Sequence, residues 1–122
     1  MPRLNVEGAV RAYLEGRMPG TRVSVSVPED RPQTLVVVRR NGGRRVNALL
    51  DRAGLDVLCW APTESEACAL AERASDLVLA LGSGHILEGF DRVEEESLRS
   101  DYDRQARSPR WYGSYTITTH KY

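Results

Sequence analysis

The stretch Asp51–Ala74, DRAGLDVLCWAPTESEACALAERA, predicts a strand, a sharp stop and a capped helix. Its first half alternates at period two, with Leu55, Val57 and Cys59 on one side and Asp56, Leu58 and Trp60 on the other. This alternation is typical of a largely buried strand. Pro62 cannot continue the hydrogen-bond ladder of that strand, because it has no N–H to donate.

The helix that follows begins with a capping signal. Thr63 and Glu66 stand three residues apart, so hydroxyl and carboxylate are placed to cap each other's backbone N–H groups. Apolar residues then recur at helical spacing, at Ala67, Leu70, Ala71, Ala74, Leu77, Val78 and Leu81. Gly82 supplies the stop. The whole stretch predicts a scaffold without a reactive group, which favours assembly over catalysis.

A helix and two strands are expected before this stretch. Asn5 is placed to cap a helix whose apolar face is Val6, Ala9, Val10, Tyr13 and Leu14. Alternation predicts a half-buried strand over Val23–Val27 and a second strand over Thr34–Arg40. Asn41-Gly42-Gly43 is a strong turn signal, and we expect a hairpin tip there. Residues 46–51 fit an extended continuation, whereas Asp51–Gly54 resembles another turn.

Two further strands are expected after the long helix. Val93–Asp101 has the pattern of an acidic, solvent-facing strand, Asp103–Arg110 that of a polar loop, and Trp111–Tyr122 the best strand composition in the chain. The predicted fold is α+β, a single domain over residues 1–122 in the order α-β-β-β-α-β-β. A mainly antiparallel sheet of about five strands would carry both helices on one face.

Composition excludes several classes of function. Seventeen basic and seventeen acidic residues cancel, which argues against a dedicated nucleic-acid or membrane-surface binder. Sixteen of the basic residues are arginine, the common cation of protein interfaces, although coding bias gives the same excess. No apolar run approaches the roughly 20 residues of a membrane helix, and the first residues lack a signal pattern. We expect a cytosolic protein with no membrane partner and reduced cysteines.

The chain offers no set of residues with the spacing of a catalytic or metal site. His85 and His120 are isolated and fit surface histidines, while Cys59 and Cys68 form no C-x-x-C pair. Asn41–Arg44 fits a phosphate cradle built from backbone N–H groups, but a hairpin tip without ligand explains it better. Consecutive glutamates on a strand point to opposite faces and cannot converge on one ion. We expect no enzyme, no cofactor and no metal.

The charges are segregated along the chain. Four arginines crowd into seven residues at Arg39, Arg40, Arg44 and Arg45. Acidic residues dominate the stretch 91–103, at Asp91, Glu94, Glu95, Glu96, Asp101 and Asp103. In a head-to-tail ring, the positive edge of one subunit would meet the negative edge of its neighbour. Two unrelated solvated patches are the simpler alternative.

Several segments together resemble the tail terminator proteins of long-tailed bacteriophages. They are PEDRPQTLVVVRRNGG, the Asp51–Ala74 stretch and the terminal RWYGSYTITTHKY. The likeness is carried by Pro28, Arg31, Pro32, Val36, Val38, Gly42, Gly43, Asp51, Arg52, Leu55, Val57, Cys59, Trp60, Ala61, Ala67, Leu70, Ala71, Pro109, Arg110, Tyr112 and Thr116. It covers nearly the whole chain, but these are scaffold residues and not an active-site motif.

This resemblance implies a structural protein of the virion, located at the tail–head junction and assembled in the bacterial host cytoplasm. Proteins of that family form a hexameric ring that caps the tail tube, stops its polymerisation and offers a docking face for the head. The implied partners are other copies of the chain, the tail-tube protein and the head–tail connector, with at most non-specific contact to DNA in the lumen. Monomers in isolation are compatible with this function. Subunit or tube contacts are expected at Arg39, Arg40, Arg44, Arg45, Asp51, Arg52, Glu94, Glu95, Glu96, Asp103, Arg104, Arg107 and Arg110.

Two alternatives remain open at this point. A head-side connector or stopper of the same junction differs from a terminator only in its choice of partner. A small nucleic-acid-binding α/β domain is a rival from a different class, because aromatic residues on strands can stack bases. The aromatics concerned are Trp60, Trp111, Tyr112 and Tyr115.

Overall fold

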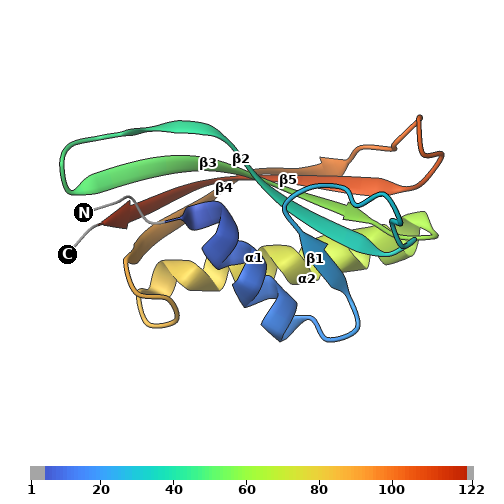
Figure 1. Ribbon diagram of the computed structural model, residues 1–122, viewed down its shortest axis with the longest axis horizontal. Helices are drawn as coiled ribbons and strands as arrows, with labels where there is room; N and C mark the ends of the chain where they lie inside the picture. Colours follow the sequence, from blue (N-terminus) through green and yellow to red (C-terminus); the bar gives the residue numbers. More distant parts are fainter. Residues whose placement is uncertain (1–4, 121–122) are drawn as a thin grey trace.

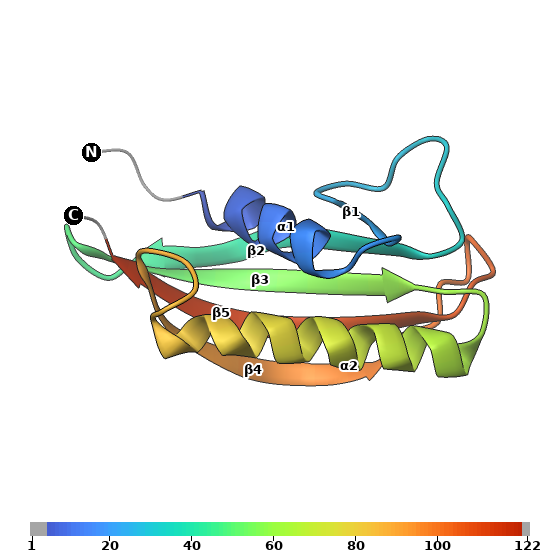
Figure 2. The ribbon, with the colours of Figure 1, turned by 90° about the horizontal axis from the view of Figure 1, so that it is seen from below.

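Five strands form one sheet, and both helices lie on the same face of it (Figure 1, Figure 2). The computed structural model describes residues 5–120. Its elements are α1 (Val6–Arg17), β1 (Arg22–Ser24), β2 (Leu35–Arg45), β3 (Leu50–Trp60), α2 (Glu64–Ala80), a short 3-10 helix η1 (Leu81–Ser83), β4 (Phe90–Ser100) and β5 (Arg110–His120). The strand order is β1-β2-β3-β5-β4, and only the β1–β2 pair is parallel. The predicted α+β fold and element order are confirmed.

The two helices are held by their caps and by each other. Thr63 Oγ1 accepts a hydrogen bond from the backbone N–H of Glu66 at 3.2 Å, and Asn5 Oδ1 accepts one from Gly8 at 3.0 Å. Arg73 donates to the carbonyl of Arg17 at the last turn of α1, where unpaired carbonyls gather. The predicted helix starts are therefore confirmed, and α2 ends at Ala80. The expected stop at Gly82 is wrong, because η1 continues through Gly82 to Ser83 and the left-handed glycine that follows is Gly84.

The main core lies between the helices and one face of the sheet, as the alternation in β3 predicts. Leu55, Val57 and Cys59 point into it and are almost fully buried. The opposite face, called here the bare face, is covered by no helix formed from residues 5–120 (Figure 1, Figure 2). Apolar side chains form a second, smaller cluster at one end of the bare face, namely Leu35, Val37, Leu58 and Trp60. Leu58 and Trp60 of the second half of the alternation in β3 are thus buried as well, whereas Asp56 is half-buried.

The expectation of a hairpin tip at Asn41-Gly42-Gly43 is wrong. The β2–β3 hairpin continues past these residues, with a bulge between Arg40 and Gly42, and turns at residues 46–49. Gly42 and Gly43 have φ of 140° and 96°, and a Cβ at Gly43 would overlap the carbonyl oxygen of Arg52. Consecutive glycines permit a bulge as well as a turn, and here the ladder resumes after the bulge. The side-chain oxygen of Asn47 closes the actual turn. It accepts hydrogen bonds from the backbone N–H groups of Leu49 and Leu50, at 2.8 and 2.9 Å.

Two other local expectations are also wrong. Asp51–Gly54 belongs to β3 and forms no turn, because Asp51 lies opposite Arg45 in the ladder and pairs with Arg40. The strand expected over Val23–Val27 is only three residues long, and the side chains of Val25 and Val27 are exposed. β1 pairs with β2 over Leu35–Val37 alone. The last two residues of the expected strand Trp111–Tyr122 lie outside the described part of the chain.

Candidate functional site

The thiols of the chain are poor nucleophiles in this fold. Burial raises the pKa of Cys59 to about 12. A hydrogen bond to Glu72 raises the pKa of Cys68. Within residues 5–120, no three His, Cys, Asp or Glu side chains are grouped so as to hold a metal ion. His120 lies 2.7 Å from the carboxylate of Asp91, and His85 is exposed on the connection to β4.

The basic residues expected at an interface divide into two groups at the β2–β3 hairpin. Arg40 is used within the chain: its guanidinium contacts Asp51 at 3.1 and 3.3 Å and the carbonyl of Gly42 at 2.9 Å. Asp51 is consequently buried. The remaining expected side chains here are exposed, namely Arg39, Arg44, Arg45 and Arg52. The hairpin therefore carries four exposed arginines, and the Arg40–Asp51 pair braces it.

The acidic residues on β4 also differ in what they contact. Glu95 anchors the strand to α2 and β5 by accepting hydrogen bonds from Ser75 and from Tyr115 OH. Glu94 forms an exposed pair with Arg92 at 3.1 Å, and Glu96 accepts from Thr116 at 3.1 Å. Because Glu95 faces α2 while Glu96 contacts a bare-face residue, the three glutamates do not converge. Glu94 and Glu96 form the acidic, exposed side of the sheet.

The basic and acidic groups lie at opposite edges of the sheet. β4 is one edge strand along its whole length. At the other edge, β1 covers only the start of β2, and Glu7 of α1 accepts a hydrogen bond from the backbone N–H of Arg40 at 2.8 Å. Among the described residues, no strand neighbours the outer part of β2, from Asn41 to Arg45, on that side. Sequence alone shows the two charge groups, and the strand order shows that they are separated by the width of the sheet.

The loop between β4 and β5 is fixed by a buried indole. Trp60 donates its Nε1–H to Asp103 at 2.9 Å, and two guanidiniums lie over the ring, Arg31 at 5.1 Å and Arg110 at 5.6 Å from the centroid. Arg110 also pairs with Asp101 at 3.0 Å. Asp103 and Arg110, expected at an interface, are thus engaged within the chain, whereas Arg104 and Arg107 are exposed on the same loop.

Asp103 makes the fold sensitive to acid. Its burial raises the pKa, but the hydrogen bonds from Trp60 and Ala106 and the charges of Arg110 and Arg31 outweigh this, so the pKa lies below its usual value. A carboxyl whose pKa is lower in the folded than in the unfolded chain stabilises the fold at any pH above its unfolded pKa, about 3.9. This contribution to stability is lost as pH falls through the folded pKa. We expect Asp103→Asn to lower the free energy of unfolding by about 1–3 kcal/mol at pH 7, as measured by urea unfolding. The difference in unfolding free energy from the wild type should shrink as pH falls below the unfolded value of about 3.9; an unchanged difference would refute the charge-based role.

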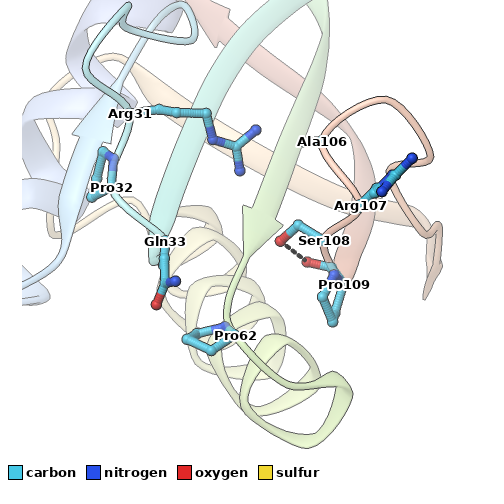
Figure 3. A pocket seen from close by; sticks show the side chains of 8 residues that line it. All are labelled: Arg31, Pro32, Gln33, Pro62, Ala106, Arg107, Ser108 and Pro109. Carbon is cyan, nitrogen blue, oxygen red and sulfur yellow. Dashed lines mark hydrogen bonds between the residues drawn. The ribbon is translucent and has the colours of Figure 1, made fainter.

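A pocket of about 380 Å³ opens beside this loop (Figure 3). The segments that line it lie at the end of the sheet opposite the hairpin turn (Figure 1). Its lining joins three segments, and consists of Arg31, Pro32, Gln33, Pro62, Ala106, Arg107, Ser108 and Pro109. Sequence reasoning missed this pocket, because its walls come from residues far apart in the chain.

The four aromatics named for base stacking do not form a shared platform. Trp60 and Tyr115 are 2% and 1% exposed. Trp111 packs against the main core and donates to Glu64, while Tyr112 lies on the bare face beneath the guanidinium of Arg99, 4.7 Å from it. Stacking of successive bases needs exposed aromatic faces side by side. This arrangement weighs against the nucleic-acid-binding alternative built on these residues.

Apolar side chains at the hairpin turn are a second feature that sequence reasoning missed. Val46 is 40% and Leu49 is 63% exposed, and the hairpin end reaches past both helices (Figure 2). Their only sequence signal is two apolar residues beside the Arg-rich segment. An apolar tip framed by arginines has the composition of a protein contact.

No protein-family model matches the chain, and no curated protein matches it. No helix within residues 5–120 is long and apolar enough to cross a membrane.

Proposed function

We propose that the chain is a structural tail terminator, which caps a phage tail tube as a head-to-tail ring, stops its polymerisation and joins it to the head. The observation that carries this proposal is the opposite charge of the two sheet edges. Arg39, Arg44 and Arg45 lie on β2 at one edge, and Glu94 and Glu96 on β4 at the other. In this proposal the protein is located at the tail–head junction of the virion, which is assembled in the host cytoplasm.

A ring follows from this charge arrangement more readily than a two-fold dimer. A two-fold contact centred on one edge would bring like charges together, β2 against β2 or β4 against β4. A head-to-tail contact pairs the basic edge with the acidic edge of the next copy, and it repeats until the ring closes. The number of six subunits in the ring is taken from the sequence resemblance to tail terminator proteins.

The hairpin tip suits contact with the end of the tube. Val46 and Leu49 are exposed beyond the helices, and Arg44, Arg45 and Arg52 frame them. Interfaces combine apolar anchors with arginine, so this tip offers both kinds of contact. The polar loop with Arg104 and Arg107 lies at the opposite end of the sheet and remains for a second partner, such as the head connector (Figure 1).

Substitution of Arg44 and Arg45 together tests the assignment of the basic edge. We expect Arg44→Ala with Arg45→Ala to reduce capping of purified tail tubes at least tenfold, because each side chain is exposed and free to contact a neighbour. The measurement is the fraction of tube ends that carry a ring in electron micrographs. Arg11→Ala is the matched control, since Arg11 lies on α1 and pairs with Glu15. Normal capping by the double variant would overturn the assignment, and binding to head connectors but not to tubes would favour the stopper alternative.

A further inference from the structure

Two arginines stand directly opposite each other on the bare face. Arg44 on β2 and Arg52 on β3 are cross-strand partners. Both lie on the bare face, because β3 alternates and its even positions, Leu58 and Trp60 among them, point away from the helices. Side chains of such a pair start about 5 Å apart, and both residues line the same hollow.

Neither arginine has an acidic partner within the described residues. Arg40, Arg92 and Arg110 all form ion pairs, whereas Arg44 and Arg52 form none in residues 5–120. Like charges directly opposite each other destabilise a sheet. The face therefore holds two positive charges side by side that no ion pair within residues 5–120 neutralises.

A hollow of about 320 Å³ lies between these arginines and β5. It is lined by Gly43, Arg44, Arg52, Gly54 and Thr116. The hollow exists because glycines replace side chains at its floor, and a Cβ at Gly54 would overlap the side-chain oxygen of Asn41. Its lining thus combines two arginines and one threonine with two glycines.

We propose that this hollow binds a phosphate group between Arg44 and Arg52. The Thr116 hydroxyl at its β5 wall already donates to Glu96 at 3.1 Å, so the two guanidiniums supply the donors. A single arginine can occupy both oxygens of a carboxylate through two parallel hydrogen bonds. Two arginines together offer ten N–H donors and two positive charges, more than one carboxylate can use. A phosphate has more acceptor oxygens and a charge of up to about −2, so it can engage both guanidiniums. The site differs from a backbone phosphate cradle, since here side chains supply the donors.

Free phosphate and the backbone of a nucleic-acid strand share this chemistry. Arg39 is exposed on the same strand, opposite Asp56 in the ladder, and extends the basic surface along β2. Glu94 and Glu96 on β4 limit that surface on the other side. A strand bound here would follow β2 and would be held without base recognition.

Amide chemical shifts of the isolated protein test the site. Titration with inorganic phosphate should shift the amides of Gly54 and Thr116, and Arg44→Gln with Arg52→Gln should weaken binding at least tenfold. Arg104→Gln, at the far end of the sheet, should leave the affinity for phosphate unchanged. A phosphate affinity that the double variant keeps, or no shift at these amides in the wild type, would overturn the proposal.

Two further titrations identify the source of the phosphate. A single-stranded oligonucleotide that binds at least tenfold tighter than inorganic phosphate, with strong salt dependence, would assign the site to nucleic-acid backbone. Equal affinities would assign it to a free phosphate or phosphomonoester. A glutamate-rich peptide that binds tighter than either would contradict the phosphate site and assign the arginines to an acidic protein partner.

Discussion

Replacing Trp60 with alanine should lower the free energy of unfolding by about 3–5 kcal/mol, the usual cost of truncating a buried tryptophan. Its ring is 2% exposed and belongs to the smaller apolar cluster on the bare face. The change removes that apolar area, the surface on which Arg31 and Arg110 lie, and the N–H that Asp103 accepts. Urea unfolding followed by circular dichroism measures the loss.

Trp60→Phe separates the packing of the ring from its hydrogen bond. Phenylalanine keeps an aromatic surface for the two arginines but leaves Asp103 without the indole donor. We expect this variant to lose about 1–3 kcal/mol, less than alanine. A loss below about 1 kcal/mol for Trp60→Ala would contradict the view that this indole holds the β4–β5 loop in place.

Reversing the charge of the acidic edge should prevent ring assembly. Glu94→Lys with Glu96→Lys places two cations where the arginines of a neighbouring β2 would lie, and like charges across an interface cost several kcal/mol. We expect association to weaken by at least a hundredfold, measured by light scattering or by ring counts on tail tubes. Neither glutamate is buried, so the fold should persist, and circular dichroism checks this.

Reversing the charge of both edges in one chain tests the head-to-tail direction of the contact. A chain with Arg44→Glu and Arg45→Glu should also fail alone, because its own acidic edge now meets acidic side chains. A chain that combines all four substitutions restores opposite charges at each contact and should regain assembly. Failure of the combined variant to assemble, while it remains folded, would contradict the head-to-tail pairing of these edges.

Local signals predict the helices and the central strand well. The alternation around Leu55 and the Thr63 cap are set by neighbours in the chain, and the structure confirms both. The hairpin turn is different. Asn41-Gly42-Gly43 satisfies the local rule for a turn, but the ladder between Arg44–Arg45 and Asp51–Arg52 and the Arg40–Asp51 pair extend the hairpin by several residues. Such tertiary contacts override local preference.

The candidate site is predicted in composition but not in arrangement. Charge counts show an arginine cluster and a glutamate cluster, while the strand order places them on opposite edges. Sequence alone does not reveal that Arg40, Asp103 and Arg110 are consumed by internal pairs. It also misses the facing pair Arg44 and Arg52, because that contact depends on a register shifted by one bulge residue.

Arrest of tube growth tests the central proposal most directly. Purified tail-tube protein would be polymerised with increasing amounts of this chain, and tube lengths and ends would be counted in electron micrographs. The proposal predicts that growth stops at substoichiometric amounts, with a ring on one end of each stopped tube. Tubes that elongate normally and carry no added density at either end, at any concentration, would contradict it.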